Sequence, residues 1–215
     1  MKKFILFILA ILPGICSISA QELTMRNVFK QMPDSLMPYL SHNSRLDMID
    51  FIDSGMKAEV SNAFDKHSWL DSITSNYMKL HLSAASSIEM KLLPAATVTT
   101  DTCKQILCVV VTYGEQPIES IVRFYTAKWN SVDIANPLKE NKLRLVAVRP
   151  DTISDSEYNK LIALTDNLMT VAHLSPSENT LTVSATMPML SADDKTLLAP
   201  HLIATTFKWN GKSFK

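Results

Sequence analysis

Apolar residues recur at every second position in two short segments of this chain. In residues 77–82, three apolar side chains alternate with Lys79 and His81, and residues 88–92 alternate in the same way. Because successive side chains of a β-strand point to opposite faces, this spacing predicts strands with one buried face. The pattern favours an antiparallel sheet whose two sides differ in polarity.

Two further strands are predicted around a turn. Residues 106–111 are apolar at every position, which is typical of a central strand covered on both faces. Gly114 and Pro117 then turn the chain into a strand over residues 120–129. With the two alternating segments, these strands form a predicted four-strand antiparallel meander.

A helical pattern precedes the meander, from residue 24 to about residue 66. Its clearest helix covers residues 45–54, where apolar side chains recur at helical spacing. Ser44 and Asp47 resemble a capping box, and Gly55 provides a C-terminal stop.

The second half of the chain partly repeats this order. A helix is predicted over residues 154–167, with Ser154 and Glu157 as its capping box. A strand is predicted over residues 143–148 and a short helix over residues 191–198.

Two pairs of segments with similar sequences support a repeat. Residues 167–175 are similar to residues 76–83, and residues 208–213 share Lys-Trp-Asn with residues 128–131. We therefore predict an α+β fold of two degenerate tandem units, each a helical segment followed by an antiparallel β-meander. The predicted units cover residues 21–135 and 136–215.

Residues 1–20 have the three parts of a secretory signal. Two lysines precede an apolar run over residues 4–12, and small residues follow, with cleavage expected after Ala20 or Ser19. We therefore expect an exported protein of the periplasm, cell surface or extracellular space. No membrane span is expected after cleavage.

Composition excludes several functional classes. The formal net charge is +0 with no block of basic residues, which argues against a nucleic-acid partner. The chain has only 4 glycines and lacks phosphate-loop and nucleophile-elbow motifs. Its 5 histidines show no metal-ligand spacing. We therefore predict no catalytic residue, no cofactor and no metal site.

The cysteines Cys103 and Cys108 are predicted not to pair with each other. Five residues of extended strand, at about 3.3 Å each, separate their Cα atoms by about 16 Å. A disulfide tolerates at most about 7 Å.

Two groups of residues are candidates for a binding surface. Aromatic and arginine side chains on outward strand positions are common anchors of interfaces, and an acidic row on one helix can face a partner. The candidates are Tyr77, Arg123 and Tyr125 on the strands and Asp47, Asp50 and Asp53 on the helix.

Two segments carry a resemblance to a known family. They are residues 32–40, Met-Pro-Asp-Ser-Leu-Met-Pro-Tyr-Leu, and residues 45–58. They resemble an uncharacterised family of exported Bacteroidales proteins, which implies no catalytic residues. The predicted architecture also resembles the beta-lactamase-inhibitor-protein fold, whose concave sheet surface binds another protein. That resemblance is one of architecture and implies no function by itself.

The sequence favours a non-enzymatic binding module whose partner is another envelope or extracellular protein. An envelope hydrolase with a site assembled only in three dimensions is the alternative. A carrier of a small apolar ligand is a further one, suggested by 11 methionines. A deep polar pocket would favour the enzyme and a long apolar cavity the carrier.

Overall fold

The structure is a computed structural model that describes residues 23–96, 104–116, 118–138, 145–146 and 153–215. Seven antiparallel strands form a large sheet in which sequence neighbours are also sheet neighbours. They are β1 (Glu59–Ser61), β2 (His67–Ile73), β3 (Tyr77–Ser83), β4 (Ser86–Pro94), β5 (Gln105–Tyr113), β6 (Glu119–Tyr125) and β7 (Ser131–Val132). A three-stranded antiparallel sheet has the order β10 (Thr205–Lys208), β9 (Thr180–Thr186), β8 (Met169–Leu174).

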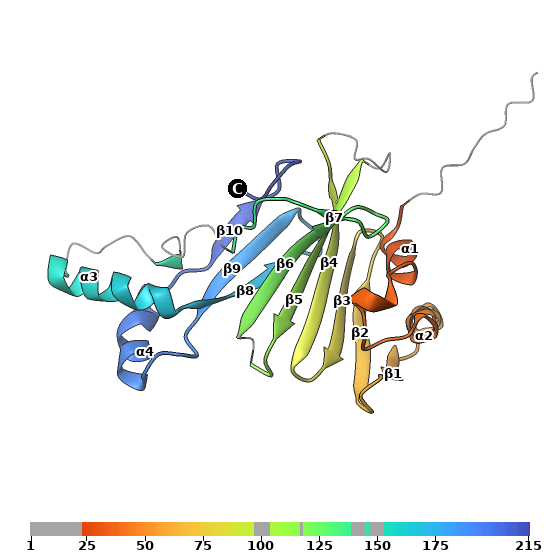
Figure 1. Cartoon of the computed structure of the whole chain (residues 1–215), viewed down its shortest axis with the longest axis horizontal. Helices are drawn as coiled ribbons and strands as arrows, with labels where there is room; N and C mark the ends of the chain where they lie inside the picture. The colour runs from red at the N-terminus through yellow and green to blue at the C-terminus, as the bar shows by residue number, and fades with distance from the viewer. Residues whose placement is uncertain (1–22, 97–103, 117, 139–144, 147–152) are drawn as a thin grey trace, which may run out of the picture.

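The helices lie at the two ends of the molecule. Figure 1 shows α1 (Met25–Lys30) and α2 (His42–Asp53) beside the first strands, and α3 (Asp155–Leu164) and α4 (Ala192–Leu198) beyond the opposite end. Short 3-10 turns are η1 (Asp34–Leu36), η3 (Thr165–Asn167) and η4 (Ala199–His201). This mixture of helices and antiparallel strands confirms the predicted α+β class. Among the described helices, none is long and apolar enough to cross a membrane.

The large sheet is wider than the predicted meander. Strands β3 to β6 match the four predicted strands, while β1, β2 and β7 add to their edges. The expectation of helix as far as residue 66 was wrong, because β1 begins at Glu59. With only three residues, β1 is too short for an alternation of apolar and polar side chains to be recognised in the sequence.

Local capping signals set the helix ends. In α2 the N-cap is Ser41, whose hydroxyl accepts a hydrogen bond from the Ser44 backbone N–H, so the predicted cap at Ser44 was wrong. The predicted stop at Gly55 is confirmed, with φ at 70° and its N–H bonded to the Ile52 carbonyl. The predicted capping box of α3 is also confirmed, since Ser154 and Glu157 bond reciprocally.

One face of the large sheet, here called the helix face, packs against α1 and α2. Along each strand, residues on this face alternate with residues on the other face. Those on the helix face form one core together with α1 and α2. Trp129 closes this core and donates a hydrogen bond from its indole to the Val28 carbonyl at 3.0 Å. The core includes Met25, Val28, Phe29, Met48, Ile49, Met78, Leu80, Met90 and Leu107.

The opposite face of the large sheet packs against the small sheet. Strand β8 contacts β4, β5 and β6, and the two sheets share a second core. Trp209 contributes to this core and donates a hydrogen bond to the Pro94 carbonyl. The core includes Leu93, Cys108, Val110, Val122, Phe124, Ala172, Leu174, Leu181 and Phe207.

Buried polar side chains of the large sheet bind the free edge of β8. The Ala172 N–H donates to the Ser120 hydroxyl at 3.0 Å, and the Leu174 N–H donates to the Glu89 carboxylate at 2.7 Å. Both N–H groups lie on the β8 edge that β9 does not pair. A buried N–H without an acceptor lowers the stability of the fold by about 1–3 kcal/mol. These two contacts therefore stabilise the packing of β8 on the large sheet.

Several predictions fall wholly or partly outside the described residues. The secretory signal of residues 1–20 does so entirely, and of the strand predicted over residues 143–148 only residues 145 and 146 are described. The division into units at residues 21–135 and 136–215 stays a prediction.

Candidate functional site

A metal-binding cluster and a reactive cysteine are two features that could support catalysis. Among the described residues, no group of three or more His, Cys, Asp or Glu side chains is placed to hold a metal ion. Cys108 is free and completely buried, and burial raises the pKa of its thiol. Since the thiolate is the reactive form, Cys108 cannot serve as a surface nucleophile.

We expect the Cys108 thiol to resist a water-soluble maleimide in the native protein and to react fully after unfolding in guanidinium chloride. Intact mass before and after unfolding checks this and also counts the thiols. Cys103 lies outside the described residues. Fast modification of Cys108 without denaturant would contradict its burial.

The side chains of β2 and β3 that lie on the same face as the small sheet are only partly covered. We call this surface the open face and define it by Trp69, Asp71, Lys79 and His81. Strand alternation places all of them opposite the core under α1 and α2. The open face is therefore the part of the sheet that remains accessible beside β8.

A β-bulge makes Asp71 an extra residue on the open face, next to His81. Trp69 pairs with His81 and Leu70 with Leu80, but the next pair is Ser72 with Lys79, so Asp71 is an extra residue in β2. A bulged residue and its neighbour can face the same side, because the ladder is interrupted there. Asp71 thereby reaches a position from which its carboxylate contacts β3.

Trp69, His81 and Asp71 hold one another in a fixed arrangement. The Trp69 and His81 rings stack with centroids 4.5 Å apart and an angle of 5° between their planes. On the same imidazole, Nε2 lies 2.8 Å from the Asp71 carboxylate. Each side chain restricts the rotamers of the next, so the surface is organised before any partner binds.

A hollow of about 460 Å³ adjoins this arrangement at the ends of the strands. Its lining residues come from β2, from the end of β3 and from the turns next to these strands, and the surface of the hollow is mainly apolar. The lining comprises Lys66, His67, Trp69, Ser83, Ala84 and Ala85. The hollow therefore places one side of Trp69 next to an accessible depression.

Charged groups mark the border between the open face and the small sheet. The His173 imidazole lies 3.1 Å from the buried Glu89 carboxylate, and this hydrogen bond raises the pKa of His173. The ammonium of Lys91 is buried and donates to the Pro176 carbonyl at 2.7 Å. Lys79 forms no ion pair with any residue that the structure describes, so its positive charge is available to a partner.

The predicted strand residues do not form one surface. Tyr77 and Tyr125 are buried, with 4% and 8% of their surfaces exposed, so the prediction that they occupy outward strand positions was wrong. Tyr77 packs in the core between the sheets, and Tyr125 packs against Trp129 under the helices. Arg123 is exposed, but it lies on the helix face and hence on the other side of the sheet from Tyr77.

The predicted acidic row lies on the exposed side of α2. Asp47, Asp50 and Asp53 are all exposed, and Asp53 is occupied by an ion pair with Arg26 at 2.7 Å. Because α2 packs on the helix face, these carboxylates are on the opposite side of the sheet from the open face. Nothing in their surroundings points to a ligand.

Sequence reasoning did not select Trp69, Asp71, Lys79 or His81 as site residues. The polar alternation of Lys79 and His81 was visible, and it correctly indicates one face of β3. The bulge and the pairing of β2 with β3 bring the other members beside them. Neither has a signal in a single sequence.

Comparisons with known proteins identify the family and support the fold. A family model described as "Protein of unknown function (DUF3256)" matches residues 15–214. The structure of a domain of an uncharacterized protein from Porphyromonas gingivalis W83 is similar, with a TM-score of 0.68 and 20% identity, over 88% of this chain and 96% of that chain. At this identity the likeness shows the fold alone. A comparison with curated proteins found no match. Since the family match spans nearly the whole sequence, this chain belongs to the DUF3256 family, whose function is unknown.

Proposed function

We propose that this protein is an exported, non-enzymatic binding module that holds a partner protein on its open face. The observation that carries the proposal is the fixed arrangement of Trp69, His81 and Asp71 on an accessible sheet surface. Binding costs conformational entropy whenever a side chain must be ordered. A tryptophan already stacked on an imidazole that in turn contacts a carboxylate avoids much of that cost.

The chemistry of the open face suits protein recognition. Tryptophan is among the residues most enriched at binding hot spots, which are surrounded by polar contacts that exclude water. Here Trp69 lies beside the 460 Å³ hollow, and His81, Asp71 and Lys79 supply polar groups around it. A stable partner would have to cover about 800 Å² of each protein, so it would extend from the hollow over β2 and β3.

Export is part of this proposal. It is supported by the composition of residues 1–20, with two lysines, an apolar run and small residues at the end. The partner would then be another protein of the envelope or of the extracellular space.

The second candidate is a hydrolase, favoured by the Asp71–His81 pair. Such a pair can activate a hydroxyl, and Ser87 is the cross-strand neighbour of His81 on the same face. Within the described residues, however, the Ser87 hydroxyl forms no hydrogen bond with that imidazole. Because no nucleophile is bonded to the Asp71–His81 pair among these residues, a role in holding the Trp69 ring is favoured over a catalytic role.

A photoreactive residue at Lys79 should form a discrete crosslinked product in cells that make this protein. Trp69→Ala should reduce that product at least about tenfold, because loss of a hot-spot aromatic costs 1.4 kcal/mol or more. Trp69→Phe, which keeps an aromatic ring, should retain most of it. Quantitative mass spectrometry of the purified adduct provides the measurement.

A photoreactive residue at Lys128 serves as the control, because Lys128 is exposed outside the open face. Equal products from both positions, or a Lys79 product unchanged by Trp69→Ala, would rule out the open face as the binding surface. Ester hydrolysis lost specifically in Ser87→Ala would instead favour the hydrolase. Thermal melting of each variant verifies that it is folded.

A further inference from the structure

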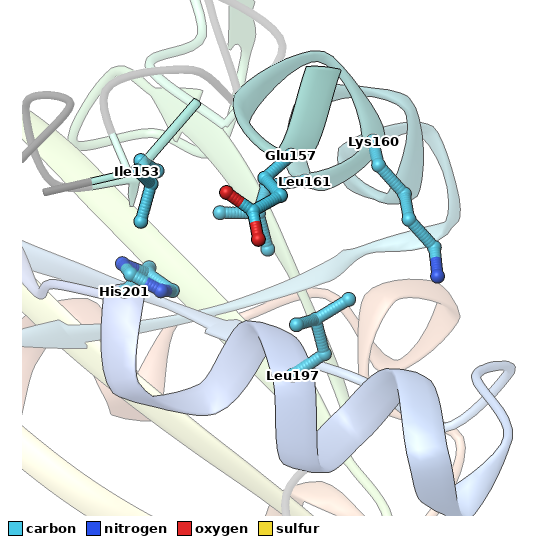
Figure 2. Close-up of a pocket in the computed structure, with 6 residues that line it drawn as sticks. All are labelled: Ile153, Glu157, Lys160, Leu161, Leu197 and His201. Atoms are coloured by element: carbon cyan, nitrogen blue, oxygen red, sulfur yellow. The ribbon is translucent and has the colours of Figure 1, made fainter. Parts of the chain in front are cut away.

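A second hollow, of about 240 Å³, lies between α3 and the segment formed by α4 and η4. Figure 1 shows these helices at the opposite end of the molecule from β2 and β3, which carry the open face. Three apolar and three ionisable side chains line it (Figure 2), namely Ile153, Leu161, Leu197, Glu157, Lys160 and His201. Such a combination allows both apolar contact and charge recognition.

The apolar part of the hollow extends the small core between α3 and α4. Leu161 is buried in that core, and Ile153 packs against it. Leu197 is 40% exposed and faces the gap, as Figure 2 shows. A ligand side chain placed here would cover apolar surface that the protein itself leaves in contact with water.

The acidic group of the hollow is held in place by the helix cap. The Ser154 backbone N–H and hydroxyl both donate to the same oxygen of Glu157, Oε2, at 2.9 and 2.8 Å. These bonds lower the pKa of Glu157, which therefore stays ionised at neutral pH. Its other oxygen, Oε1, has no hydrogen-bond partner among the described residues.

Two nitrogen bases flank that carboxylate. Figure 2 shows the carboxylate of Glu157 in the middle of the gap, with His201 on one side and Lys160 on the other. Neither the Lys160 ammonium nor the His201 imidazole has an ion pair within the described part of the chain. Both can therefore donate to an anionic group.

We infer that this hollow binds a free α-amino acid with an apolar side chain, of about the size of leucine. The ligand's ammonium would donate to Glu157, its carboxylate would accept from Lys160, and its side chain would contact Leu197, which lies between these two groups in Figure 2. A ligand with only one charge would leave the opposite group of the site uncompensated. The volume lies below the roughly 300–1,000 Å³ of sites for drug-sized ligands, which fits so small a molecule.

The probe is L-leucine, titrated into the full chain and followed by calorimetry and by chemical shifts of α3 and α4. We expect saturable binding at millimolar concentration or below. Three analogues test the recognition: 4-methylpentanoate lacks the ammonium, 3-methylbutylamine lacks the carboxylate, and glycine lacks the apolar side chain. Each should bind at least about tenfold more weakly.

Lys160→Met should weaken leucine binding at least about tenfold, because it keeps the apolar stem and removes the charge. Lys128→Met, which changes an exposed lysine that lines neither hollow, should bind leucine as the native chain does. The inference is overturned if leucine gives no saturable signal up to about 10 mM, if Lys160→Met leaves its affinity unchanged, or if any analogue binds as tightly. No residue of the open face is changed in this test, so its outcome does not decide the proposed function, which has its own crosslinking experiment.

Discussion

Arg45→Met should lower the free energy of unfolding by about 3 kcal/mol, since each hydrogen bond from a buried charged group contributes roughly 1.5–3 kcal/mol. Arg45 is 1% exposed and donates to the carbonyls of Leu40 and Met32 at 2.8 and 2.7 Å. These bonds join α2 to the irregular segment that precedes it. Methionine keeps the apolar contacts of the stem but leaves both carbonyls without a donor.

Thermal and urea unfolding of the full chain measure this effect. For a chain of this length, the loss corresponds to a decrease in Tm of about 6–12 °C. Asp34→Asn is the matched control, because Asp34 pairs with Arg45 at 2.9 Å but is 69% exposed. An exposed partner contributes about 0–1 kcal/mol, so the control should change stability little. Native-like melting of Arg45→Met would show that the two carbonyl contacts are dispensable.

Glu89→Ala should lower the free energy of unfolding by about 2–3 kcal/mol, because a buried N–H at the contact between the two sheets loses its charged acceptor. The carboxylate is 8% exposed, accepts from the Leu174 N–H and lies beside His173. Glu89→Gln retains an acceptor for the Leu174 N–H, so its free energy of unfolding should fall by less. Hydrogen exchange at the Leu174 amide reports on this contact directly.

The same contact should make stability depend on pH. The hydrogen bond to Glu89 raises the pKa of His173 above its ordinary value of 6.5, with burial and the nearby Lys79 opposing it. A group whose pKa is raised on folding stabilises the fold fully below its unfolded pKa and loses that contribution as pH rises through the folded pKa. Unfolding at pH 5.5, 6.5, 7.5 and 8.5 should therefore show this loss in the native chain and a flatter profile in Glu89→Gln. Identical profiles would assign the dependence to other groups.

The candidate binding surface shows where strand periodicity is insufficient. Alternation correctly places Tyr77 on the same face of β3 as Lys79 and His81. It carries no information on which part of that face is covered. The small sheet arrives from a segment about 85 residues further along the chain, as the bond between Leu174 and Glu89 shows, and that packing buries Tyr77. Arg123 and Tyr125 lie on the other face, because the observed register pairs them with Val109 and Leu107.

Short-range physics allowed the sequence alone to determine the strand cores β3 to β6, the stop at Gly55 and the capping box of α3. Each depends on side chains within a few residues of one another, through alternation, a positive φ or a side-chain to backbone hydrogen bond. Only the tertiary structure decided which sheet surface stays open, how the bulge in β2 brings Asp71 to His81, and where α3 and α4 leave a hollow. These features arise where separate elements meet, and the position of each depends on packing contacts that no local pattern encodes.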